Sequence, residues 1–390
     1  MTTNQQFNNH LLPLWTDDTL QTPAFVYDEE HIVEKLELLS RVRRNSGCHI
    51  LYSVKALSFN TLLQTIAGYV DGFSVSSLFE SRLAREVLGN SGSIHLTSPG
   101  IRRDDMPEIS GSCDYISFNS LQQFMHNRQW TGKLSCGVRV NPGMSFVKDE
   151  RYDPCRKYSK LGIPLSELDT VYTNPDLLKE ISGLHVHSNC ESDNFNELEQ
   201  SIEKLTHQYG ELLTRMQWIN LGGGYLLKDQ DQLDVLCRLV RRLRQQYGLE
   251  IYFEPGKAIV SSAGYLVASV IDIFSSNGKT IAVVDTTVNH LPEVFEYQYR
   301  PHVLQDIPDG NHEYRIAGSS CLSGDLFGDY HFDKPLETGS RIIFSNVGAY
   351  MLVKANMFNG INLPCVYRLD RTARIHQVKK YDYTDFRSRL

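Results

Sequence analysis

Residues 48–55, CHILYSVK, are a short apolar run that ends in a lysine, and runs of this kind decide the fold. Segments between the runs carry apolar residues at helical spacing, such as Leu198, Ile202 and Leu205. Strands that alternate with helices pair in parallel, so eight such units predict a closed (β/α)8 barrel. The eight runs are 48–55, 72–76, 93–97, 114–118, 134–140, 181–188, 218–221 and 250–254.

The pattern changes after residue 254, where apolar runs are joined by turns and not by long helices. The runs at 264–274, 280–285, 312–316 and 341–347 predict an antiparallel β domain, which the early run 24–27 could join. We therefore expect a barrel over 28–262, inserted into a β domain made of 1–27 and 263–390.

Composition narrows the class of protein. The 390 residues carry a formal charge of −7, which argues against a nucleic-acid binder because such a protein needs a basic face. No apolar run approaches the roughly 20 residues of a membrane helix, and residues 1–10 lack the pattern of a signal peptide. Eight scattered cysteines without a C-x-x-C motif favour reduced thiols and a cytoplasmic location.

Polar residues stand at the carboxyl ends of the predicted barrel strands, where barrel enzymes place their chemistry. A polar segment, 144–159, follows the fifth run and is predicted to be an active-site loop. Each candidate residue also has an interpretation without a catalytic role: a solvated lysine at the barrel rim, a histidine buried in the core, a simple turn at the glycines, or a buried structural acid. The residues concerned are Lys55, Arg139, His185, His187, Gly222–Gly224 and Glu254.

Two other interpretations of these residues, a metal site and a nicotinamide site, have little support in the sequence. His185 and His187 could form a metal pair, but no second cluster of ligands accompanies them in the sequence, so we expect no metal. The triplet Gly222–Gly224 lacks the G-x-G-x-x-G pattern and the later acid of a nicotinamide site.

Together the residues fit pyridoxal phosphate. A lysine amine can bind the cofactor covalently, and glycine N–H groups can approach its phosphate. A carboxylate beside the pyridine nitrogen keeps the ring protonated, and a histidine can stack on its face.

At this point the chain resembles the fold-type III pyridoxal-phosphate-dependent decarboxylases, from about Thr22 to Arg387. The resemblance implies a TIM-type, alanine-racemase-like (β/α)8 barrel with a C-terminal antiparallel β domain. It also implies a homodimer with active sites at the interface. The motifs that carry it are 52–56 (YSVKA), 183–188 (GLHVHS), 221–225 (LGGGY), 254–256 (EPG), 321–325 (CLSGD), 347–350 (VGAY) and 358–360 (FNG).

The resemblance also implies roles for single residues. Lys55 is similar to the Schiff-base lysine, His185 to the ring-stacking histidine, and Glu254 to the partner of the pyridine nitrogen, close to the substrate. The expected contacts to the cofactor also include Ser188, Gly222, Gly223, Gly224, Gly256 and Tyr350.

Three further residues concern the substrate. Cys321 resembles the catalytic cysteine that the partner subunit places beside the substrate Cα. Asp325 is similar to the acid that contacts the distal amine. Asp285 could pair with a cationic tail as well, although a solvated turn acid is an equally good reading.

The form Cys-Leu-x-Gly-Asp resembles the carboxynorspermidine (carboxyspermidine) decarboxylase branch, because Leu322 replaces the acid that follows the cysteine in diaminopimelate and ornithine enzymes. This implies decarboxylation of a carboxylated polyamine in spermidine biosynthesis. Lys257 departs from the arginine or glutamate of relatives. The alternatives are a diaminopimelate, ornithine, arginine or lysine decarboxylase, an amino-acid racemase, or a non-catalytic relative that binds the cofactor.

Overall fold

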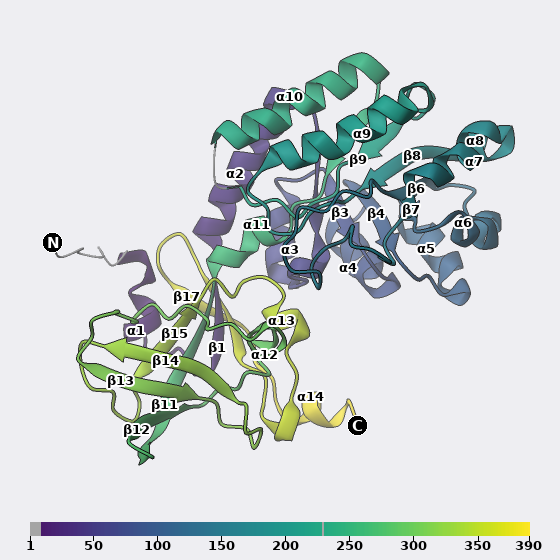
Figure 1. Ribbon diagram of the computed structural model, residues 1–390. Coiled ribbons are helices and arrows are strands. Elements are labelled where there is room, and N and C mark those ends of the chain that lie inside the picture. Colours follow the sequence, from purple (N-terminus) through teal and green to yellow (C-terminus); the bar gives the residue numbers. More distant parts are fainter. Residues whose placement is uncertain (1–8, 228–229) are drawn as a thin grey trace. The chain divides into compact units, whose positions relative to one another are not determined.

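The computed structural model describes residues 9–227 and 230–390, which form two compact units (Figure 1). One unit is Glu34–Ala258, and the other combines the residues up to Val33 with Ile259–Leu390. Residues 1–8, on which the predicted lack of a signal peptide largely depends, lie outside the described residues.

The unit Glu34–Ala258 is a closed barrel of eight parallel strands, as the sequence predicts. The first strand β2 pairs with the last strand β10, and β5 pairs with β6, so the sheet has no open edge between them. A two-residue strand, β7 (Ile163–Pro164), is added beside β6. The eight strands are β2 (His49–Ser53), β3 (Gly72–Val75), β4 (Ser93–Ser98), β5 (Tyr115–Phe118), β6 (Ser135–Asn141), β8 (Ile181–Val186), β9 (Trp218–Asn220) and β10 (Glu250–Phe253).

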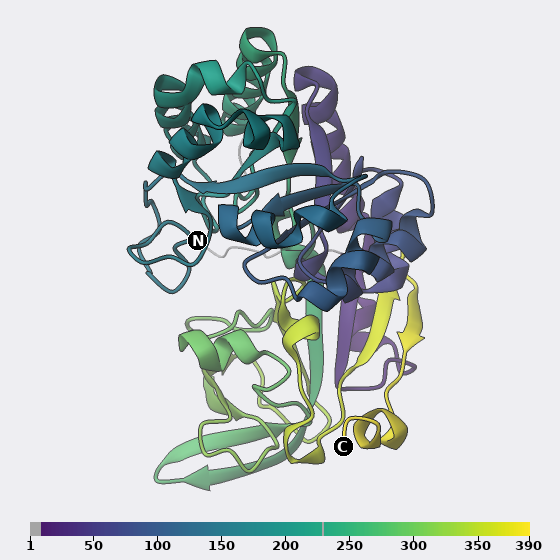
Figure 2. The same ribbon diagram turned by 90° about the vertical axis from the view of Figure 1, so that its right-hand side faces the viewer.

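Helices cover the outside of the barrel (Figure 2). In α4 the Ser77 side chain caps the first turn, the buried face includes Ala84 and Leu88, and Gly89 ends the helix at a φ of 57°. The helices are α2 (Glu29–Ser46), α3 (Asn60–Ala67), α4 (Leu78–Leu88), α5 (Met106–Ser112), α6 (Leu121–Asn127), α7 (Leu168–Thr173), α8 (Pro175–Glu180), α9 (Phe195–Leu213) and α10 (Gln230–Tyr247).

Aromatic side chains fill the barrel near the amino ends of its strands. The indole of Trp218 packs against Gly137 and Gly183, and its Nε1 donates a hydrogen bond to the Ser135 hydroxyl at 2.8 Å. The His95 ring stacks on Tyr115 with centroids 4.0 Å apart. This packing closes one end of the barrel, so polar chemistry is confined to the other.

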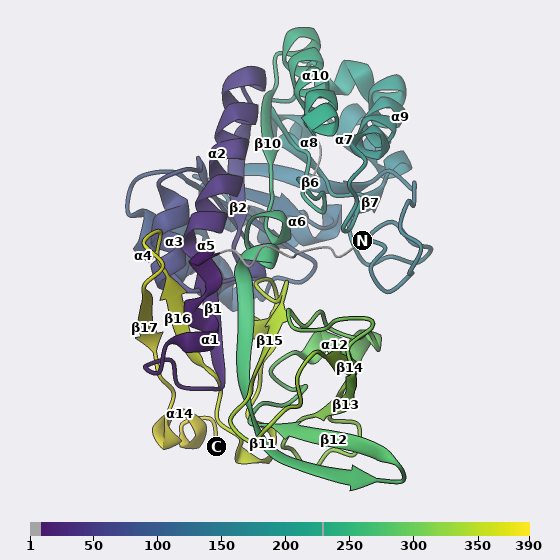
Figure 3. The same ribbon diagram turned by 90° about the vertical axis from the view of Figure 1, so that its left-hand side faces the viewer.

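The second unit is built on a mostly antiparallel sheet. The first half of the long strand β11 pairs with β1 and β15, and its second half pairs with β12 (Figure 3). Its core includes Val26, Val267, Ile343 and Leu369. The strands are β1 (Ala24–Asp28), β11 (Gly264–Ser276), β12 (Lys279–Val284), β13 (His312–Ala317), β14 (Leu326–Phe332), β15 (Arg341–Ser345), β16 (Cys365–Leu369) and β17 (Ile375–Lys379).

The sheet differs from the sequence prediction in two respects. Strands β14, β16 and β17 were not predicted, and two pairs, β1 with β16 and β12 with β13, are parallel. A parallel pair needs a long crossover connection. Residues 285–311, which contain α12 (Pro292–Tyr297), form the connection between β12 and β13. The connection between β1 and β16 includes the whole barrel, because the barrel is inserted between the two pieces of this unit.

The remaining helices of the chain are short: α1 (Pro13–Thr16), α11 (Lys257–Val260), α13 (Met351–Lys354) and α14 (Tyr383–Arg387). In the described part of the chain, no helix has the length and apolar character needed to cross a bilayer.

The contact between Gly183 and Trp218 yields a stability prediction. A Cβ on Gly183 would lie 2.1 Å from the indole, so Gly183→Ala should overpack the barrel and lower the free energy of unfolding by about 1–3 kcal/mol. Urea unfolding followed by tryptophan fluorescence measures this change. Gly111→Ala in α5 is the control, because a Cβ there meets no atom within 4 Å. Equal stability of the two variants would contradict the packing role of Gly183.

Candidate active site

The carboxyl ends of the barrel strands bring charged and polar side chains together. Lys55 follows β2, Arg139 lies near the end of β6, His185 lies in β8, and Glu254 follows β10. The charges of Lys55, Arg139 and Glu254 all act on the His185 ring. The strand ends predicted from the sequence therefore do meet at one mouth.

Glu254 is the buried anion of this group, with 6% of its surface exposed. Its Oε1 accepts a hydrogen bond from Asn220 Nδ2 at 2.6 Å, and its Oε2 lies 3.4 Å from His185 Nε2. Burial raises the pKa of Glu254, but His185, Asn220 and Lys55 together outweigh burial and hold that pKa well below its ordinary value. Glu254 is therefore a carboxylate at neutral pH.

Asn220 is a residue of this site that the sequence interpretation missed. It is the last residue of β9, and its side chain also accepts the Gly222 N–H at 2.9 Å. One amide thus orients both the carboxylate and the start of the glycine triplet. Its place directly before Leu221–Gly224, at the end of a predicted strand, was the available signal.

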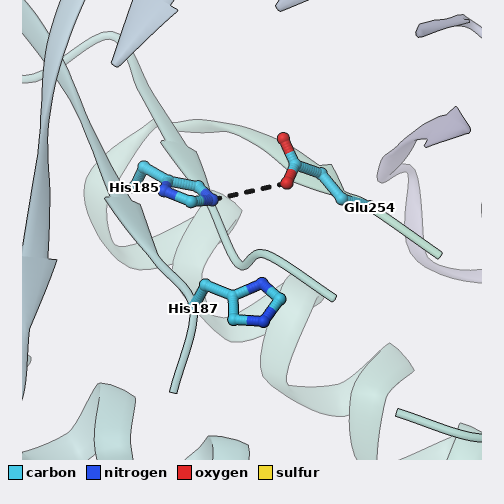
Figure 4. A group of neighbouring side chains, drawn as sticks. All are labelled: His185, His187 and Glu254. Atoms are coloured by element: carbon cyan, nitrogen blue, oxygen red, sulfur yellow. Dashed lines mark ion pairs between the residues drawn. The ribbon is translucent and has the colours of Figure 1, made fainter. Parts of the chain in front are cut away.

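His185 is enclosed, with 1% of its surface exposed, and neither ring nitrogen makes a hydrogen bond within the described residues. Figure 4 shows its ring directed at the Glu254 carboxylate, with the His187 ring beside them. Burial lowers the pKa of His185, against the opposing charge of Glu254. A flat, neutral ring at this place can cover one face of another planar group.

Lys55 lies in the 3₁₀ turn Val54–Ala56 directly after β2. Its side chain is exposed at the barrel mouth. Desolvation by the surrounding protein lowers the pKa of Lys55, Glu254 opposes this effect, and Arg139 adds to it. A lowered pKa increases the fraction of neutral, nucleophilic amine.

The glycine triplet forms a tight turn after β9. Gly222 and Gly224 have positive φ values of 67° and 89°, which favour glycine. The Gly222 N–H is bound by Asn220, and the Gly223 N–H donates to His187 Nδ1 at 3.0 Å. Gly224 is the one glycine of the triplet whose N–H makes no hydrogen bond to the described residues.

Ser188 and Gly256 complete the set expected to surround the cofactor. The Ser188 hydroxyl is fully buried and makes no hydrogen bond within the described residues, which is unusual for a buried hydroxyl. Gly256 lets the chain after β10 approach the turn that carries Lys55, because a Cβ there would lie 2.9 Å from the Ser53 side chain.

A metal ion is the alternative to a cofactor at the barrel mouth. The donor atoms of His185, His187 and Glu254 lie within 4.8 Å of one another. However, one His187 nitrogen already accepts the Gly223 N–H, and Glu254 already accepts from Asn220. The prediction of no resident metal stays a prediction.

Lys257 and Glu191 form an ion pair at the mouth, with Nζ and Oε1 2.5 Å apart. Glu191 adopts a positive φ of 56°, which is unusual for a residue with a side chain. The unexpected lysine after Glu-Pro-Gly therefore has a partner on the loop that follows β8.

The second unit holds the predicted cysteine on an exposed loop. The Cys321 N–H donates to the Asn359 side chain at 2.8 Å, and Asn359 itself has a φ of 57°. This contact joins the Phe358-Asn359-Gly360 motif to the cysteine motif in the folded chain.

The two predicted substrate acids have backbone partners in their own unit. Asp325, 3% exposed, accepts the Val288 N–H at 2.7 Å and the Ser320 N–H at 2.9 Å. Asp285 accepts from the Ser269 N–H and the Thr22 hydroxyl, and burial raises its pKa. These bonds stabilise the fold of the loops, and substrate contact by either acid stays a prediction.

Tyr350 lies directly before α13 and has a φ of 68°. Its turn follows Gly348, where a Cβ would lie 1.8 Å from the Val260 carbonyl oxygen. Contact of Tyr350 with a phosphate also stays a prediction.

The residues of the barrel mouth fit pyridoxal phosphate. A lysine whose pKa is lowered, an ionised glutamate and a buried histidine ring meet the needs of the cofactor ring. The buried Ser188 hydroxyl and the Gly224 N–H can bind a phosphate.

Comparison with known proteins agrees with this geometry. The family model of the pyridoxal-dependent decarboxylases, pyridoxal binding domain, matches residues 29–261. A carboxynorspermidine/carboxyspermidine decarboxylase of Campylobacter jejuni is 33% identical over 95% of this chain and 98% of its own length. A carboxyaminopropylagmatine decarboxylase of Synechocystis is also 33% identical, over 95% and 96%.

Solved structures give the same result. The crystal structure of carboxynorspermidine decarboxylase from Campylobacter jejuni, complexed with norspermidine, matches with a TM-score of 0.86 at 32% identity, over 95% of this chain and all of that one. A diaminopimelate decarboxylase structure matches with a TM-score of 0.81 at 19% identity, over 97% and 94%, and so supports the fold alone. With a lysine, a histidine and a glutamate at the barrel mouth, a family match over residues 29–261 and relatives over 95% of its length, the chain belongs to the family of pyridoxal-dependent decarboxylases.

Proposed function

We propose that this enzyme, a pyridoxal-phosphate-dependent carboxy-lyase, removes the carboxyl group of a carboxylated polyamine, namely carboxynorspermidine or carboxyspermidine, in polyamine biosynthesis. The observation that carries the proposal is the similarity to the Campylobacter jejuni enzyme over nearly the full length of both chains. The Cys321-Leu322-Ser323-Gly324-Asp325 motif supports the same branch.

A second candidate substrate is carboxyaminopropylagmatine. The Synechocystis relative named for that activity is as similar to this chain as the Campylobacter jejuni enzyme is. The two kinds of substrate differ in their distal group, a guanidinium in one and an amine in the other. A planar guanidinium binds a carboxylate through two parallel hydrogen bonds, whereas an ammonium acts as a point charge, so direct competition can separate them.

Each residue of the barrel mouth has its own proposed role in the reaction. When bound, pyridoxal phosphate supplies an electron sink for the breaking bond between Cα and the carboxylate. Lys55 would hold the cofactor covalently through its Nζ, and the lowered pKa of this amine favours the neutral form that such a bond needs. Glu254, as a carboxylate, would favour a proton on the pyridine nitrogen, and the His185 ring would cover one face of the cofactor.

Cys321 is proposed to return a proton to Cα from its Sγ, with Lys55 Nζ as the alternative donor. The cysteine is exposed, and exposed apolar side chains lie beside its loop: Phe295 contacts Gly324, Leu326 follows Asp325, and Phe358 precedes Asn359. Exposed apolar groups that cluster in this way mark interaction surfaces. They support a homodimer in which this loop is covered by the partner.

All eight cysteines are free thiols, and five of them are buried. Reduced thiols of this kind support the proposed cytoplasmic location, since oxidising compartments favour disulfides.

Lys55→Ala tests the covalent link. The variant should lose the cofactor that borohydride fixes to the protein, because no other lysine is proposed to hold it, and it should lose decarboxylation as well. Intact mass after borohydride reduction is the measurement. Lys179→Ala, at an exposed position on α8, is the control and should keep the added mass. Retained turnover in Lys55→Ala would show that another residue holds the cofactor.

Cys321→Ala tests the proton donor. Loss of a general acid typically slows a reaction by about 10²–10⁴-fold, so kcat should fall steeply while the absorbance of bound cofactor is unchanged. Cys365→Ser is the control, because Cys365 lies in β16 and has no proposed role. If Cys321→Ala instead released the cofactor, the assignment to proton transfer would be wrong.

A substrate panel tests the branch. Carbon dioxide release should have the highest kcat/KM with carboxynorspermidine or carboxyspermidine, above carboxyaminopropylagmatine. The panel also contains meso-diaminopimelate, ornithine, lysine and arginine. A preference for any of these four would refute the polyamine branch, and a preference for carboxyaminopropylagmatine would transfer the assignment to the second candidate.

A further inference from the structure

His187 contacts the glycine triplet at two points. Its Nδ1 accepts the Gly223 N–H at 3.0 Å. Its Cβ packs so closely on Gly222 that a Cβ added to that glycine would lie 2.6 Å away. His187 is the residue after the end of β8, whereas the ring-stacking candidate His185 lies inside the strand. The two histidines of the H-x-H motif therefore have different surroundings and can have different roles.

We propose that His187 is a positioning residue for cofactor binding, which shapes the glycine turn so that the turn receives the phosphate of pyridoxal phosphate. The hydrogen bond fixes Gly223, and Asn220 fixes Gly222. The turn then leaves the Gly224 N–H for a ligand, next to the loop that carries the buried Ser188 hydroxyl. Asn189 of that loop supports this placement, because a Cβ on Gly224 would lie 2.1 Å from its carbonyl oxygen.

The hydrogen bond determines the protonation state of the ring. Because Nδ1 accepts, the proton of the neutral imidazole must be on Nε2. Burial lowers the pKa of His187 well below its ordinary value, and the charges of Arg139 and Lys55 add to this while Glu254 opposes it. The groups that face the ring are Arg139 of β6, Lys55 after β2, His185 of β8 and Glu254 after β10. The ring is therefore neutral near pH 7 and remains an acceptor.

The backbone around His187 is also held in place. The guanidinium of Arg139, which is 8% exposed, donates to the His187 carbonyl oxygen at 3.4 Å. Burial lowers the pKa of Arg139 to about 10, so it stays charged at neutral pH. A cation at this point adds positive potential at the place where a phosphate is expected.

The test compares three substitutions at one position. In His187→Asn, the side-chain oxygen stands where Nδ1 stands and can accept the Gly223 N–H. In His187→Gln, the oxygen is one bond further away, and in His187→Leu there is no acceptor. Apoenzyme of each variant is titrated with pyridoxal phosphate and with pyridoxal, which lacks the phosphate, and the absorbance of the bound cofactor gives both dissociation constants.

Leaving the buried Gly223 N–H unsatisfied should weaken pyridoxal phosphate binding by about 10-fold or more in His187→Leu and His187→Gln. Pyridoxal binding should change by less than about threefold, and His187→Asn should restore pyridoxal phosphate affinity to within about threefold of the unaltered protein. A loss that is equal for both ligands would assign His187 to general packing and overturn the proposal. So would unchanged binding in all variants, or a folded His187→Asn that behaves like His187→Leu. None of these measurements uses a substrate, so the result does not depend on which amine the enzyme decarboxylates.

Discussion

The pairing of β2 with β10 is the constraint on which the rest of the site depends. These strands are separated by about 200 residues of sequence, yet His49 lies opposite Tyr252 and Ile50 opposite Phe253. The Ser53 N–H continues the ladder to the Pro255 carbonyl, and Gly256 allows the two chain segments to approach. Closure of the barrel thereby sets the lysine that follows β2 beside the carboxylate that follows β10. Without this pairing, neither group would shift the pKa of the other.

Closure of the barrel also determines the electrostatics of the site, because it brings the charged side chains together in a buried place. A buried carboxylate is costly unless it is paired or hydrogen-bonded, and Glu254 accepts a hydrogen bond from Asn220 and has His185 Nε2 3.4 Å from its other oxygen. The same enclosure that favours a neutral Lys55 also favours neutral histidine rings. One small volume therefore holds an ionised carboxylate, a lysine whose pKa is lowered and two histidines whose pKa values are lowered. These directions suit pyridoxal chemistry, which uses an acid beside the ring nitrogen and a nucleophilic amine.

Much of the barrel could be predicted, because each of its strands is a continuous apolar run bounded by helical periodicity. The β unit was predicted less completely. Strand β14 follows directly from the cysteine loop and mixes polar with apolar residues, and β17 is largely polar and has no buried residue. Lys55, His185 and Glu254 stood out because a charge at the end of a buried strand is conspicuous. Asn220 did not, because an amide looks the same in a sequence whether it faces solvent or orients a buried carboxylate.

The order of apolar runs and the residue types at their ends were sufficient for the fold class, the cofactor and the family, since these depend on local periodicity and on short motifs. Which polar atoms are already occupied depended on the folded chain. Gly222, Gly223 and Gly224 are equivalent in the sequence, but the structure binds the first to Asn220 and the second to His187. The first bond is local, because Asn220 lies two residues before Gly222. The second joins the triplet to His187, which follows the neighbouring strand β8, and only the closed sheet determines which strands are neighbours. Hydrogen bonds depend on distances of a few tenths of an ångström, and no pattern of residue types carries that information.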